Sequence, residues 1–175
     1  ADGAPPKHTF FYPVEQFDSA VVGRIAELCR DTGSELEVHL HHDRDTAENL
    51  RATLDTAKAN LVELGMLAPD HSGAIRFGFI HGNWALDHSH PHGEHCGVPD
   101  ELRILREAGC YADFTLPSAP NRTQTRTINS LYYAREDGEP KSHHPGRRVR
   151  ADREARSDSP DELLIVQGPL ALNWR

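Results

Sequence analysis

The chain has 175 residues, of which 37% are hydrophobic, which is enough for one domain with a buried core. Its 27 acidic side chains outnumber the 19 basic ones, and the resulting net charge of −8 would repel a phosphate backbone. No apolar run approaches the roughly 20 residues that span a bilayer. We therefore expect neither nucleic acid nor a membrane as a partner, and the sequence specifies no oligomeric state.

The three cysteines are Cys29, Cys96 and Cys110, and no two of them form a CxxC pair. An odd number without paired spacing indicates neither a disulfide framework nor a structural zinc knuckle. A reducing compartment fits this usage, so we expect a cytoplasmic protein. The chain lacks an initial methionine and stops in an apolar stretch, and we expect it to be a fragment of a longer protein.

A strand and a helix are the first elements expected. Residues 8–13 are rich in aromatic side chains and end in proline, as a short strand does. After Asp18, apolar side chains recur at helical spacing until Gly33 ends the helix. These apolar positions are Val21, Val22, Ile25, Leu28 and Cys29.

Residues 35–41 alternate strictly between apolar and polar side chains, which predicts a second strand with two unlike faces. The apolar face carries Leu36, Val38 and Leu40, and the polar face carries Glu35, Glu37, His39 and His41. A long helix follows, for which we expect Asp45 to be the N-cap and Gly65 the stop. Its buried stripe is Leu50, Leu54, Ala57, Leu61 and Leu64.

Strands and helices keep alternating in the middle of the chain. We expect a strand at 75–82, a helix at 99–108 and a strand at 110–116. Such alternation favours a parallel sheet with right-handed crossovers. Further along we expect a short strand at 129–134, an irregular charged loop at 135–160 and a last buried strand at 162–167.

An open doubly wound sheet and a closed barrel both fit this alternation. A polar strand face is easier to place in a barrel lumen than under covering helices. We therefore expect the α/β class and a distorted (β/α) barrel of the TIM type, incomplete here, with residues 1–175 forming a single domain truncated at both ends. Chemistry in such barrels occurs at the carboxyl ends of the strands, where this sequence places its histidines.

His39 and His41 project from one strand face about 6 to 7 Å apart, close enough to converge on one metal ion. Solvated polar residues on an exposed strand are the simpler alternative. Four ligand-type residues in five positions nevertheless favour metal, because His42 and Asp43 follow directly. His81 ends the next strand and is expected to be a third ligand or a general acid, unless it only bonds a neighbouring carbonyl.

Substrate and proton-transfer residues are expected near the same strand ends. Trp84 offers a flat face for a sugar ring beside Asn83, although it could equally be a packing residue. Asp113 lies near the end of its strand and can act as a general base or orient a ligand, with surface capping as the alternative. His143 is a further, weaker candidate. The histidine-rich loop at 87–96 resembles a metal tract by composition and is more readily a lid.

Several segments carry a resemblance to known proteins. Residues 37–43, 79–86 and 110–120, followed by Lys141, Ser142 and His143, resemble a group of bacterial proteins from polysaccharide gene clusters. That group is similar to polysaccharide deacetylases and related glycoside hydrolase/deacetylase barrels, and the resemblance runs from about Thr9 to Trp174. It implies a distorted (β/α) barrel, a zinc-type metal, hydrolysis of an N- or O-acetyl group on a sugar, and a complete protein that continues beyond both ends.

The sequence also departs from the deacetylase pattern. Deacetylases carry paired aspartates on their first strand, where this chain has residues 8–13 without an aspartate. Their two ligand histidines are separated by three residues, whereas here the nearest arrangement is His39, His41 and His42.

The expected function is therefore a metal-dependent hydrolase of an acetylated carbohydrate or small acylated substrate. His39, His41 and His81 would hold a divalent metal, zinc above others, and Asp43 or Asp113 would take the proton. An amidohydrolase-like metal hydrolase is one alternative, because such barrels also bind metal through a His-x-His pair. A barrel that binds carbohydrate without catalysis is the other.

Overall fold

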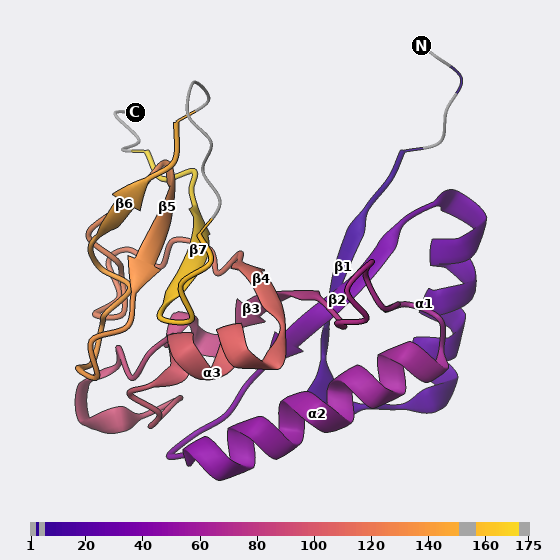
Figure 1. The fold of residues 1–175 in the computed structure, drawn as a ribbon, viewed down its shortest axis with the longest axis horizontal. Coiled ribbons are helices and arrows are strands. Elements are labelled where there is room, and N and C mark those ends of the chain that lie inside the picture. Colours follow the sequence, from indigo (N-terminus) through magenta and orange to yellow (C-terminus); the bar gives the residue numbers. More distant parts are fainter. Residues whose placement is uncertain (1–2, 4–5, 151–156, 172–175) are drawn as a thin grey trace.

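The computed structural model describes residues 3, 6–150 and 157–171, which form a seven-stranded mixed sheet and three α-helices (Figure 1). The sheet order is β1-β2-β3-β4-β7-β5-β6. The strands are β1 (Thr9–Pro13), β2 (Glu35–Leu40), β3 (Phe77–His81), β4 (Cys110–Asp113), β5 (Ser130–Arg135), β6 (Gly146–Arg148) and β7 (Glu162–Gln167). The expectation of an α/β fold is confirmed.

The first five strands in sheet order run parallel, and the last two run antiparallel to their neighbours. In the register of β2 and β3, His39 pairs with Ile80 and Leu40 with His81. This pairing brings the carboxyl ends of both strands to the same edge of the sheet. The histidines that follow these strands therefore come close together in space.

The helices begin and end where the sequence provides the necessary chemistry. In α1 (Ser19–Thr32) the Asp18 side chain accepts hydrogen bonds from the first turn, and Gly33 adopts the left-handed conformation that ends the helix. In α2 (Ala47–Glu63) the N-cap is Thr46, whose hydroxyl accepts from Asn49 N. The expectation that Asp45 caps this helix was wrong by one residue, because the Asp45 carboxylate bonds His42 instead.

A single hydrophobic core lies between one face of the sheet and the helices. Helices α2 and α3 (Glu101–Ala108) pack side by side against it (Figure 1). Leu36, Val38 and Leu40 of β2 are buried there, as the alternation predicts. On the opposite face of β2 Glu37 is buried at 7% exposure, and its carboxylate accepts hydrogen bonds from Gly78 N and Tyr111 Oη.

Some features differ from the expected barrel. In the described part of the chain the sheet ends at β1 on one side and at β6 on the other, so it is an open sheet rather than a closed one. The segment expected to be irregular contains β6, while residues 151–156 lie outside the described residues. None of the described helices has the length and apolar composition needed to cross a membrane.

Candidate functional site

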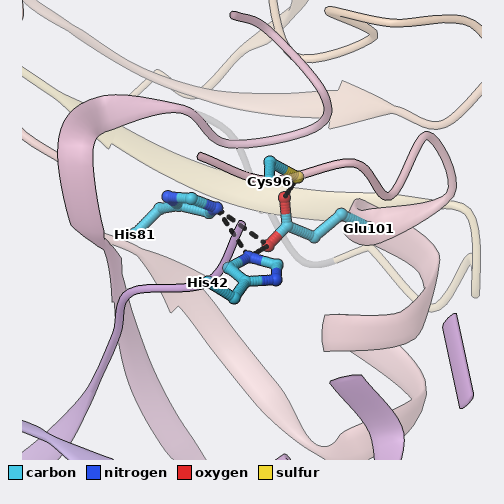
Figure 2. Close-up of side chains that lie close together, drawn as sticks. All are labelled: His42, His81, Cys96 and Glu101. Carbon is cyan, nitrogen blue, oxygen red and sulfur yellow. Dashed lines mark hydrogen bonds and ion pairs between the residues drawn. The ribbon is translucent and has the colours of Figure 1, made fainter. Parts of the chain in front are cut away.

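Four potential metal ligands converge at the carboxyl edge of the parallel strands: His42, His81, Cys96 and Glu101 (Figure 2). His42 follows β2, His81 ends β3, Cys96 lies in the loop between β3 and α3, and Glu101 begins α3. Their ligand atoms all lie within 4.8 Å of one another. His81, Cys96 and Glu101 are at most 1% exposed, so the cluster is part of the protein interior.

The imidazole rings of His42 and His81 face each other through their Nε2 atoms, which are 2.8 Å apart. The Nδ1 atom on the other side of each ring faces an oxygen atom. His42 Nδ1 lies 2.9 Å from Asp45 Oδ2, and His81 Nδ1 faces the carbonyl oxygen of Gly82. Both of these oxygens are acceptors, so each Nδ1 carries the hydrogen. In the neutral rings, therefore, two Nε2 lone pairs point at each other.

The Glu101 carboxylate is a third electron-rich group next to these two nitrogen atoms. Its Oε1 lies 3.3 Å from His42 Nε2 and 3.5 Å from His81 Nε2, yet receives no well-directed hydrogen bond from the described residues. Buried polar atoms without partners are rare, since each costs about 1–3 kcal/mol. Two imidazole lone pairs and an unpartnered carboxylate oxygen form a site that favours a cation.

The other Glu101 oxygen fixes the side chain in place. Oε2 accepts a 2.5 Å hydrogen bond from Asp87 N and lies 3.3 Å from the Cys96 thiol. Cys96 Sγ in turn accepts from His88 N and Val98 N, each at 3.3 Å. Burial, followed by the nearby Glu101 charge, raises the pKa of the Cys96 thiol well above its usual range. Only a bound cation would therefore make Cys96 a thiolate at neutral pH.

A proton and a metal ion would compete for the space between His42 Nε2, His81 Nε2 and Glu101 Oε1. Burial opposes the charged form of His42, but the Glu101 and Asp45 carboxylates outweigh it and raise the pKa of His42. Burial lowers the pKa of His81 to about 4, so His81 stays neutral. A protonated His42 can thus occupy the position of the cation when metal is absent, and acid should weaken metal binding.

The residues fit a zinc ion in number and type. Two imidazoles, a thiolate and a carboxylate are typical zinc ligands in a tetrahedral shell. Bonds of 2.0–2.1 Å place two nitrogen ligands about 3.4 Å apart, so the two rings would separate by about half an ångström on binding. A buried group of His, Cys and Glu in this chain can therefore hold a metal ion.

A small cleft with a free volume of about 10 Å³ adjoins the cluster, and Trp84, Asp113, Thr115, His143 and Gln167 are among the residues that line it. Trp84 is 45% exposed. Its backbone φ is 56°, a left-handed conformation that bulky residues rarely adopt. Such strain is often retained where a side chain must present itself to a ligand.

The titratable groups of the cleft have shifted pKa values. Burial raises the pKa of Asp113 to about 7, although the Thr115 hydroxyl at 2.6 Å and backbone N–H at 3.2 Å partly offset it. Burial, followed by the neighbouring His144, lowers the pKa of His143 to about 3. At neutral pH the cleft therefore holds a half-protonated carboxyl and a neutral imidazole, a combination suited to proton transfer.

Two hydrogen-bonded routes connect the cleft to the buried cluster. His81 N donates to Thr115 Oγ1 at 2.8 Å, and this hydroxyl donates to Asp113 Oδ1. On the other side, Asp87 donates its N–H to Glu101 and holds His143 through Oδ2 at 3.5 Å. Burial, Glu136 and Glu101 raise the pKa of Asp87 to about 10, so its contact with His143 joins two neutral groups.

The expected ligands His39, His41 and His81 do not form one group in the structure. His81 belongs to the buried cluster with His42, whereas His39 and His41 contact each other, with Nε2 atoms 3.3 Å apart. His39 lies on the strand face opposite Leu40, while the chain turns after His41 and directs His42 toward α3.

The other expected residues fall into two groups. Trp84, Asp113 and His143 line the same cleft, so the structure brings together the expected sugar platform and two expected proton-transfer residues. Asn83 is exposed and Asp43 half-exposed, and neither lines that cleft. Asp43 instead accepts a 2.5 Å hydrogen bond from His95 N and so secures the histidine-rich loop.

Cys96 and Glu101 are the two potential ligands that the sequence analysis did not assign to a metal site. Cys96 had no apparent partner in the sequence, and Glu101 was counted only as part of a helix. The available signal was a thiol and a carboxylate five positions apart, just before and at the start of a helix. A carboxylate at a helix N-terminus is favoured in any case, so only the fold reveals its second role.

No protein-family model, curated protein or solved structure matches this chain.

Asp113 makes stability depend on pH. Its pKa in the folded state is about 7, above the 3.8 of an unperturbed Asp, so the folded state favours the protonated form. This contribution is complete below pH 4 and is lost as the pH rises through 7, with an upper bound of about 4 kcal/mol. Urea unfolding of metal-free protein from pH 4 to pH 8 should show this decline in wild type. The decline should be smaller in Asp113→Asn, in which Asp87 with its pKa of about 10 still contributes, and parallel curves for the two proteins would refute the assignment.

Proposed function

We propose that this protein is a metal-dependent hydrolase that acts on an acetylated carbohydrate, with zinc in the buried cluster and the substrate in the adjoining cleft. The observation that supports it is the double connection between the two sites. The same hydrogen-bonded network holds a metal-competent ligand group and a cleft with an exposed indole and two groups able to exchange protons.

Each residue of the cleft has a defined task in this proposal. Trp84 stacks on the apolar face of a sugar ring. Asp113, with a pKa of about 7, removes or returns a proton at its carboxyl oxygen, and neutral His143 can accept one at its ring. Thr115 keeps Asp113 in place through two hydrogen bonds. A divalent ion, when bound, supplies positive charge that stabilises anionic groups and orders the loop through Cys96.

A second candidate function is favoured by one observation. Two imidazoles, a thiolate and a carboxylate would fill a tetrahedral shell, and closed shells of this kind are typical of structural zinc. The protein would then bind carbohydrate without hydrolysing it, and the ion would link β2, β3 and α3. No observation of the described residues favours the amidohydrolase-like alternative in particular.

The proposal also includes three expectations from the sequence: a distorted (β/α) barrel, a cytoplasmic location and zinc as the metal. The run of parallel strands with helices packed on one core is compatible with part of a distorted (β/α) barrel. A reducing, cytoplasmic setting is compatible with three cysteines that are free and buried. Zinc is preferred over magnesium or calcium because those ions take oxygen ligands rather than imidazole and thiolate.

Acetate release is the direct test of the hydrolase proposal. Zinc-loaded protein would be incubated with N-acetylated chitooligosaccharides and with O-acetylated xylooligosaccharides, beside Trp84→Ala and Trp84→Phe. We expect release by wild type, a large rise in KM for Trp84→Ala, and partial retention by Trp84→Phe because an aromatic face remains. Saturable sugar binding without any acetate would contradict the hydrolase and support the binding protein.

A further inference from the structure

A second pair of histidines lies at the end of β2, separate from the buried cluster. His39 Nε2 and His41 Nε2 are 3.3 Å apart, and their rings are nearly perpendicular at 85°. The His41 side chain is 41% exposed, so an ion can reach this pair from solvent. The proposed function makes no use of this pair.

Hydrogen bonds at the opposite nitrogen fix the tautomer of both rings. His39 Nδ1 lies 2.9 Å from the carbonyl oxygen of Ile80, and His41 Nδ1 lies 2.8 Å from Glu15 Oε1. A carbonyl and a carboxylate oxygen only accept, so both Nδ1 atoms carry hydrogen. In neutral rings the two Nε2 lone pairs then face each other with no hydrogen between them, which is an unfavourable contact unless a cation or an added proton lies there.

The spacing matches that of two ligands on one ion. Zinc–nitrogen bonds of 2.0–2.1 Å place two ligands of a tetrahedral ion about 3.4 Å apart, and the Nε2 atoms are already at 3.3 Å. The surroundings also support the rings as ligands do: metal-binding histidines usually donate Nδ1–H to a carboxylate or a carbonyl. Gly82 leaves room for the His41 ring, because a Cβ there would lie 2.2 Å from His41 Cδ2.

We infer that His39 and His41 form a second, solvent-accessible binding site for a late first-row divalent ion such as Zn²⁺, Ni²⁺ or Cu²⁺, with Glu15 and the Ile80 carbonyl orienting the two rings. Imidazole suits these ions. The pair supplies two protein ligands, so water or an exogenous oxygen ligand completes the shell. This site is therefore open and exchangeable, unlike the four-ligand cluster of the interior.

The alternative occupant of this place is a proton. A proton shared between the two Nε2 atoms would remove the repulsion of their lone pairs, and the pair would then need no metal. The two occupants give different results in a metal titration, because a pair that only shares a proton takes up no ion at neutral pH.

Calorimetric titration of chelator-stripped protein with Ni²⁺ or Zn²⁺ tests this inference. Wild type should bind two ions per chain, and His41→Ala, a change at a partly exposed side chain, should remove one of them. Glu15→Gln should weaken the same site about 10- to 100-fold, because it removes the carboxylate that orients His41. His90→Ala/His92→Ala, in the histidine-rich loop, is the matched control and should keep both ions.

Cu²⁺ paramagnetic resonance adds a structural readout to the titration. Copper at this site should show coupling to two imidazole nitrogens in wild type and lose it in His39→Ala/His41→Ala. An unchanged titration in His41→Ala, or a second ion lost only in the loop variant, would overturn the inference. The test is independent of hydrolysis: failure to release acetate leaves this site standing, and loss of this site leaves the buried cluster intact.

Discussion

His42→Ala/His81→Ala is expected to lose the tightly held metal ion and to melt about 8–16 °C below the zinc-loaded wild type. The change removes two of the four buried ligands. An ion at 1,000 times its Kd stabilises the folded state by about 4 kcal/mol, and each kcal/mol shifts Tm by about 2–4 °C in a chain of this size. Plasma mass spectrometry after dialysis, with differential scanning calorimetry, measures both effects.

A more conservative change at the same cluster distinguishes the loss of a metal ligand from the loss of folding. In Glu101→Gln the amide oxygen can still accept from Asp87 N, while the amide N–H₂ points at the two Nε2 lone pairs. This variant should fold as stably as metal-free wild type, because the lone pairs gain a donor, and should lose more than about 100-fold in zinc affinity. His71→Ala, at an exposed site, is the control. Full zinc content in Glu101→Gln would contradict the ligand assignment.

Asp113→Asn is expected to lower kcat for acetate release by about 10² to 10⁴, which is the usual contribution of a positioned acid or base. The carboxyl is buried in the cleft wall with a pKa of about 7, so kcat of wild type should change through that pH and kcat of the variant should not. Steady-state kinetics from pH 5 to pH 9 measure this. KM should change little, because Trp84 still binds the sugar.

Two control variants make this result specific. Asp55→Asn, on the exposed side of α2, should leave kcat unchanged. Asp43→Asn tests the other carboxylate that the sequence suggested, which secures the histidine-rich loop rather than lining the cleft. A large loss in Asp43→Asn together with none in Asp113→Asn would reverse the assignment of the proton-transfer group.

Local patterns predicted the elements of this fold well. The alternation in residues 35–41 and the apolar stripe ending at Gly65 correspond to β2 and α2, because strand and helix periods depend on burial of one face. Thr46 rather than Asp45 caps α2, and this was not predictable from the cap preference alone, since both residue types are good caps. The fold decides it by giving Asp45 a histidine to bind.

The metal ligands were harder to predict, for a geometric reason. Strand periodicity places His39 and His41 on one face, and the structure agrees that they meet. That periodicity ends with the strand, so it says nothing about His42, which turns toward the interior. Cys96 and Glu101 join His42 only through the packing of α3 near the ends of β2 and β3, a contact between residues more than 50 positions apart in sequence.

For a similar reason, the alternation of strands and helices along the sequence did not determine whether the sheet closes. Alternating strands and helices predict parallel neighbours, which β1 to β4 are. The same pattern does not distinguish an open from a closed sheet. It also did not reveal that β5 would run antiparallel to β7 through six paired residues, a long-range pairing that no local period encodes.

Anomalous diffraction from crystals of the zinc-loaded protein, recorded on both sides of the zinc absorption edge, tests the central claim most directly. We expect a strong anomalous peak among His42 Nε2, His81 Nε2, Glu101 Oε1 and Cys96 Sγ, at about 2.0–2.3 Å from its ligands. Such a peak would establish the buried metal centre on which the proposed hydrolase depends. A map with no peak there, or with zinc only on the His90 to His95 loop, would contradict it.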